Sequence, residues 1–180
     1  MPHRQAGAGG VAGVALTAFA EMLLAGGHRN SLGRSAEVLA AVQADPSRIE
    51  ELFGCVGDDD AWVRMRAIDT FEKLVRADPA LGAPYVEALL ELTASEQPSI
   101  QWHLAQLFPV LSLSAAHRRR VVAWLRDRLA TTEVDWIVAA NAMQALVALD
   151  PVHAPPLVTV QLAHRWAPVR RKAAALLESL

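Results

Sequence analysis

The sequence predicts an all-α protein, a right-handed α-solenoid of about four to five stacked helical hairpins. The composition favours helices, because 53% of the 180 residues are apolar, only 6% are aromatic, and alanine and leucine dominate. A helix start signal recurs at regular intervals, and the apolar residues behind each signal keep one phase. A second apolar helix follows each of these segments. Because a single helical hairpin cannot bury its own apolar face, the copies are expected to stack.

The start signals are three Asp-Pro pairs and one serine. Asp45, Asp78 and Asp150 each precede a proline, as expected for an acidic N-cap with Pro at the first helical position. Ser114 takes the cap position of the remaining unit, and the four caps lie 33, 36 and 36 residues apart. Positions seven, eight and eleven residues after each cap are apolar, with Gln161 as the exception. The predicted units are 45–77, 78–113, 114–149 and 150–180.

The second helix of each unit is predicted to open at Val63, Ile100, Ile137 or Val169. Five, eight and eleven residues later the positions are again apolar, so these side chains are expected in the core. The helix of the unit 114–149 has almost no polar face. Its core register is expected to shift by one residue, and its surplus apolar surface is explained either by packing inside the stack or by a partner. The shifted core residues would be Val138, Ala142, Leu146 and Leu149.

The N-terminal region holds a weaker fifth copy over about 11–44. A single domain is predicted over 11–180, after a flexible tail at 1–10. The stretch that ends at Ala18-Phe19-Ala20 also mimics a signal peptide, but its glycines and its helical period favour a tail leading into a helix. The apolar stripes expected in the two helices are Leu16, Phe19 and Leu23, then Leu32, Ala36 and Leu39.

Two segments resemble the second helix of HEAT repeats. Residues 59–68 read Asp-Asp-Ala-Trp-Val-Arg-Met-Arg-Ala-Ile, and residues 167–174 read Ala-Pro-Val-Arg-Arg-Lys-Ala-Ala. The resemblance covers roughly residues 31–180. It implies a HEAT-like superhelix whose second helices line the concave surface. In that family an Asp before the helix and an Arg inside it commonly form a ladder, here Asp60 and Arg64, but later units lack one partner or both, so no continuous ladder is expected.

Charge and motifs give no support to several function classes. The formal charge is −2, so no overall basic surface points to nucleic acid or to an anionic membrane. No uncharged apolar run reaches the roughly 18 residues of a membrane span. The histidines lack the helical spacing of a zinc site, so no metal and no cofactor is expected, and no catalytic motif supports an enzyme. The single Cys55, in an apolar run, suits a buried thiol and a cytoplasmic protein.

Charge is distributed unevenly. Residues 1–96 hold 14 acids and 8 bases, whereas residues 97–180 hold 5 acids and 9 bases. The run from His117 to Arg120, with Arg126 and Arg128 two turns on, could bind phosphates or an acidic partner. The solvated outer face of a helix explains it better. Of the five tryptophans, Trp124 is expected in the core, while those preceding three second helices are expected to pack between units: Trp62, Trp136 and Trp166.

Binding is expected on the outward side of the second helices, where the HEAT resemblance places the concave surface. The candidate partner-binding residues are Arg66, Asp69, Trp102, His103, Gln106, Met143 and Arg171. We expect a non-enzymatic interaction or scaffold module that binds a segment of another protein, with Trp102 and Met143 as apolar anchors. The alternative is a HEAT-like DNA-binding protein or alkylated-base DNA glycosylase, because such glycosylases line their groove with Trp, Asp and Arg. The negative net charge makes nucleic acid the weaker choice, and a homo-oligomer is a further option.

Overall fold

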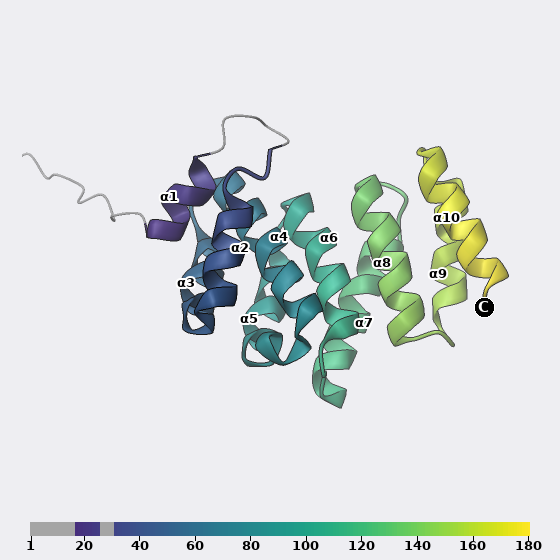
Figure 1. Ribbon diagram of the computed structural model, residues 1–180. Helices are drawn as coiled ribbons and strands as arrows, with labels where there is room; N and C mark the ends of the chain where they lie inside the picture. The colour runs from purple at the N-terminus through teal and green to yellow at the C-terminus, as the bar shows by residue number, and fades with distance from the viewer. Residues whose placement is uncertain (1–16, 26–30) are drawn as a thin grey trace, which may run out of the picture.

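The computed structural model describes residues 17–25 and 31–180, and this part of the chain is helical, without a β-strand. The all-α prediction is therefore confirmed. Figure 1 shows the helices in a row, with α1 and α10 at opposite ends. The predicted tail at 1–10 and the predicted helical residue Leu16 lie outside the described residues.

Ten α-helices form five hairpins over the described residues. The odd-numbered helix of each hairpin is here called its first helix and the even-numbered one its second helix. Short 3₁₀ segments extend most first helices, and η3 (Pro79–Tyr85) is the longest of them. The helices are α1 (Ala18–Leu24), α2 (Ser35–Ala44), α3 (Ile49–Gly54), α4 (Ala61–Ala77), α5 (Val86–Glu91), α6 (Pro98–Leu107), α7 (Ala115–Leu129), α8 (Trp136–Leu149), α9 (Ala154–Val160) and α10 (Ala167–Glu178).

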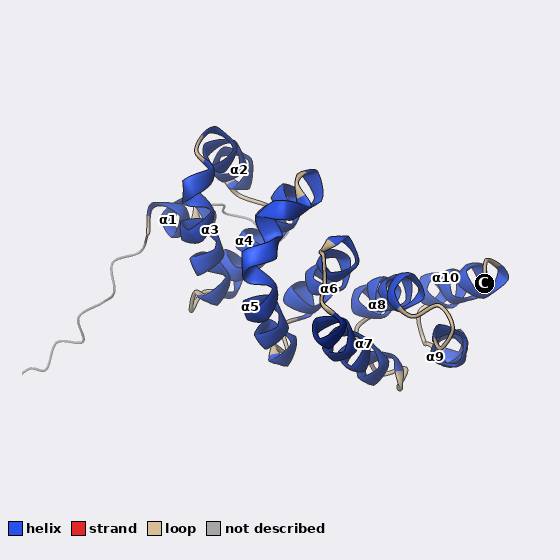
Figure 2. Ribbon diagram, turned by 90° about the horizontal axis from the view of Figure 1, so that it is seen from below, coloured by secondary structure: helices blue, strands red, loops and turns tan. Residues whose placement is uncertain are grey.

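The second helices pack against one another in chain order. α2 contacts α4, α4 contacts α6, α6 contacts α8, and α8 contacts α10. First helices pack likewise in the pairs α1 and α3, α5 and α7, and α7 and α9. Figure 2 shows the two sets as two layers. Each hairpin therefore buries its apolar face mainly against the hairpins before and after it.

The predicted caps are confirmed at three of four positions. Ser114 Oγ accepts the His117 amide at 3.1 Å and opens α7, while Asp45 and Asp78 cap 3₁₀ segments that lead into α3 and α5. The prediction was wrong at Asp150, which ends α8: its amide donates to the Leu146 carbonyl and its carboxylate binds His153. The following Pro151 opens a turn, and α9 begins only at Ala154.

The predicted apolar phase is largely confirmed. All four positions eleven residues after the caps are buried, including the polar Gln161, whose side-chain amide donates to the Leu129 and Thr131 carbonyls at 2.9 Å. A buried amide is tolerated there because backbone acceptors satisfy its donor group. Trp124 lies in the core as expected, in edge contact with Phe108.

The register shift predicted for α8 is also confirmed. The four residues of the shifted register are buried, and Ala148, which belongs to the unshifted register, is exposed. The stripe predicted for α2 was wrong. Leu32 and Ala36 are exposed and Leu39 is half-buried, because the residues that face the neighbouring helices are Ser35, Val38 and Val42.

Candidate partner-binding face of the second helices

The outward side of α4, α6, α8 and α10 forms a continuous half-exposed surface, here called the second-helix face. Because successive second helices contact one another, their outward side chains lie in neighbouring rows. The side chains of this face are Met65, Asp69, Lys73, Trp102, Gln106, Ala140, Gln144 and Arg171.

Trp102 is the large aromatic residue of this face. It lies in the middle of α6 and is half-buried. Its ring stacks on the imidazole of His103, with 3.4 Å between the ring centroids and 30° between the planes. Because packing holds the indole, a partner that covers it would not need to order it first, which lowers the entropic cost of binding.

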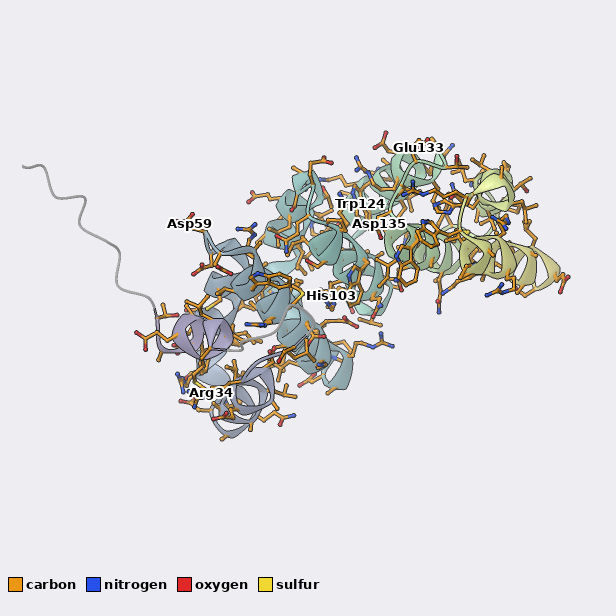
Figure 3. All side chains as sticks on the ribbon, turned by 90° about the horizontal axis from the view of Figure 1, so that it is seen from above. Arg34, Asp59, His103, Trp124, Glu133 and Asp135 are labelled. Carbon is orange, nitrogen blue, oxygen red and sulfur yellow. The ribbon has the colours of Figure 1, made fainter. Side chains whose placement is uncertain are left out.

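His103 is buried, and its expected exposure was wrong. Its Nδ1 hydrogen-bonds the Glu72 carboxylate on α4, and the other oxygen of that carboxylate accepts from Arg76. At this position of α6 the side chain faces α4, the preceding second helix, rather than solvent. His103, labelled in Figure 3, therefore joins α6 to α4, and its imidazole stacks against the Trp102 ring.

Arg66 is also buried and does not point into the second-helix face. Its guanidinium donates to the carbonyls of Leu23 and Leu24, where α1 ends, and to the carbonyl of Ser31 at 2.9 Å. The last carbonyls of a helix lack intrahelical donors, so an arginine from a neighbouring helix satisfies them. This side chain fastens the first hairpin to the second and is not available to a partner.

Asp69 and Gln106 lie on the face but are already engaged. Asp69 accepts from Lys73 at 2.6 Å, within α4. Gln106 bridges three second helices, because it accepts from Arg76 on α4 at 3.1 Å and donates to Asn141 on α8 at 3.0 Å. Gln106 thereby aligns three neighbouring helices, and both side chains add polar groups to the second-helix face.

The last two candidates differ in exposure. Met143 is fully buried, which corrects its expected role as an anchor: the shifted register of α8 turns it into the core. Arg171 is exposed on α10. Beside it, Lys172 donates to Gln144 at 2.8 Å, and burial lowers the pKa of its ammonium group.

Several second helices carry a side chain that hydrogen-bonds the carbonyls of the loop before the helix, and the sequence indicated only some of these donors. Arg64 and Arg170 each donate to the backbone carbonyls five and six residues earlier, and Gln101 donates to the carbonyl six residues earlier. The equivalent Val138 has no donor, and His164 of the next unit donates instead to the Val134 carbonyl at 3.0 Å. The Arg64 Nε also donates to Gln97 Oε1 at 2.9 Å, which links α4 to the start of α6. The sequence signal for these donors is that Arg64, Gln101 and Arg170 take the same position in their units.

Three tryptophans are exposed rather than packed between units, which corrects the sequence expectation. The exposed fractions are 37% for Trp62, 44% for Trp136 and 48% for Trp166. All three lie at or immediately before the start of a second helix. They lie at the starting edge of the second-helix layer, whereas Trp102 lies within its face.

A cavity of about 390 Å³ lies where α6 begins, α7 ends and α8 begins. Carboxylates dominate its wall, but Asp127 binds Arg128 and Asp135 caps α8 through the amides of Ile137 and Val138. Figure 3 shows Glu133 and Asp135 at this place, apart from His103. Within residues 17–25 and 31–180, no group of three or more His, Cys, Asp or Glu side chains is placed to hold a metal ion.

Comparison with protein-family models, with curated proteins and with solved structures found no match to this chain. In the described part of the chain, no helix has both the length and the apolar character needed to cross a membrane.

Proposed function

We propose that this chain is a HEAT-like, right-handed α-solenoid that acts as a scaffold, holding a segment of another protein along its second-helix face. The observation that carries the proposal is Trp102, a half-buried indole stacked on a buried imidazole in the middle of that face. Large aromatic side chains with few rotatable bonds are the commonest anchors of protein interfaces.

The surroundings of Trp102 support a peptide-like occupant. The same face carries the half-buried polar side chains of Gln106 and Asp69, both hydrogen-bonded within the protein, and Arg171 supplies an exposed cation on α10. An apolar centre with a polar rim is the usual anatomy of a protein interface. Cys55 is buried and its thiol is free, which supports action in the reducing cytoplasm.

The glycosylase considered as the alternative has no specific observation in its favour. It would need Arg66, Asp69 and Trp102 to meet in one groove. The Arg66 guanidinium is instead engaged by the end of α1, and Asp69 pairs with Lys73.

The test is affinity capture from the native extract with three forms of the protein: wild type, Trp102→Ala and Trp166→Ala. Trp166 is the matched control, an exposed tryptophan outside the second-helix face. A captured protein should be retained by wild type and by Trp166→Ala, and purified partner should bind Trp102→Ala about 30-fold more weakly, the loss typical of an interface anchor.

Urea unfolding of the same three proteins separates binding from folding. Trp102→Ala is expected to remain cooperatively folded, with a loss of stability too small to explain the loss of binding. If Trp102→Ala unfolds under the binding conditions, or if both variants lose the partner equally, the indole is not an anchor and the proposal fails.

A further inference from the structure

A second surface lies on the other layer of the molecule, between α7 and the turn from α8 to α9. It is a groove of about 690 Å³. Its floor is apolar, made by Val122 and Ala123 of α7 and by Leu149 at the end of α8. We call it the α7 groove.

Two arginines flank this floor without a carboxylate partner in the described part of the chain. Arg119, Val122, Ala123 and Arg126 follow one another at i, i+3, i+4 and i+7, so they share one face of α7. At 1.5 Å per residue, the two arginines are about 10 Å apart along the helix axis. Both are exposed.

The other basic residues of α7 are already used inside the molecule. His117 and Arg120 both bind Glu87 on α5, at 2.8 and 2.7 Å. Arg118 donates to the Leu149 carbonyl at 3.1 Å and so fixes one wall of the groove. The run from His117 to Arg120 is therefore not simply a solvated face: three members are structural, and Arg119 remains for a ligand.

The one carboxylate in the groove does not neutralise the arginines. Asp150 accepts from His153 at 2.8 Å, within the same turn. Arg118, Arg119 and Arg126 thus give the groove a positive charge in a protein whose overall charge is −2. Opposite charge on the occupant would be favoured, and the apolar floor would be covered only by an apolar side chain.

We propose that the α7 groove is a docking site for an acidic protein segment that places apolar side chains between two carboxylates. A helix with Glu at i and i+7 and Leu at i+3 and i+4 repeats the spacing of α7 itself with inverted charge. The apolar floor favours a protein over a nucleic acid, whose phosphates would contact the arginines but leave Val122 and Ala123 uncovered. This site is independent of the second-helix face.

The probe is a fluorescent 16-residue peptide made of two copies of Glu-Ala-Ala-Leu-Leu-Ala-Ala-Glu, measured by anisotropy with the full chain. Binding should weaken at least tenfold for Arg119→Glu/Arg126→Glu and should fall as salt rises from 50 to 500 mM. It should stay unchanged for Arg34→Glu/Arg165→Glu, which makes the same charge change at exposed arginines outside both proposed binding surfaces. Circular dichroism and thermal unfolding verify that both double variants fold.

Two further peptides and one oligonucleotide complete the test. Replacing every Glu by Lys, or every Leu by Ser, should each abolish binding. The proposal is overturned if the serine peptide binds as well as the parent peptide, or if the two double variants of the protein weaken peptide binding equally. It is also overturned if a 16-nucleotide oligothymidylate binds more tightly than the peptide. None of these results bears on Trp102, so the scaffold proposal is tested separately.

Discussion

Replacing Arg66 by methionine should detach the first hairpin and leave the rest of the chain folded. The substitution keeps an unbranched stem of similar volume but removes the guanidinium that donates to the carbonyls of Leu23, Leu24 and Ser31. Those carbonyls then lose a buried donor. Since each hairpin contacts mainly its neighbours, the loss should remain local.

The structure also sets the size of the effect. A hydrogen bond to a charged group contributes about 1.5–3 kcal/mol, and the contact with the Leu24 carbonyl is long, at 3.5 Å. Removing the desolvation cost of a buried cation offsets part of the loss. The net destabilisation expected for opening α1 and α2 is about 2–4 kcal/mol, or about 30- to 1000-fold in the opening equilibrium.

Native-state hydrogen exchange read by mass spectrometry measures this directly. Peptides from α1 and α2 should exchange 30-fold or more faster in Arg66→Met, while peptides from α6 and α8 keep wild-type rates. Arg34→Met is the control, because Arg34 lies at the start of α2 in the first hairpin and, among the described residues, pairs with the exposed Glu37. Equal acceleration along the whole chain would refute the reasoning, since it would mean that the hairpins unfold as one unit.

Three other outcomes follow from local packing and charge. In urea unfolding, Gly82→Ala should lower the free energy of unfolding by about 1–2 kcal/mol, because the new Cβ would lie 2.5 Å from a methyl group of Leu111. Gly54→Ala has open space around it and should raise the free energy of unfolding by about 0.5–1 kcal/mol. Hydrogen bonds from Arg120 hold the pKa of Glu87 below its usual range. The stabilisation from this carboxylate is therefore complete above its unfolded pKa and is lost as the pH falls through its folded pKa, so Glu87→Gln should lower Tm at pH 7, and the difference from wild type should shrink as the pH is lowered. Burial raises the pKa of the Cys55 thiol, so iodoacetamide at pH 8 should modify the native protein far more slowly than the urea-unfolded one.

The sequence predicted the helical hairpins and most of their core because both depend on local periodicity. The one-residue shift of α8 followed from counting its polar residues, and it was confirmed by the burial of Val138 and Leu146. Asp45, Asp78 and Asp150 all end the helix before them, and the carboxylates of the first two also accept a backbone amide of the next segment. The Asp150 carboxylate binds the His153 ring instead, which the Asp-Pro pair by itself does not reveal.

The candidate site was harder to predict because it depends on contacts between units. Arg66 and His103 stand at the position three residues past the opening of a second helix, which a helical wheel places at the border of the outward face. The carbonyls at the end of α1 and the carboxylate of Glu72 draw them inward. These acceptors lie 31 or more residues away in the chain, so no local pattern reveals them.

The most direct test of the scaffold proposal is oxidative footprinting of the tryptophans with and without the purified partner. Trp102, Trp62, Trp136 and Trp166 report on the same sample, so three of them serve as internal references. Partner binding should protect Trp102 from oxidation and leave Trp166 at its free rate. An unchanged oxidation rate at Trp102 in the saturated complex would contradict the proposal that the second-helix face holds the partner.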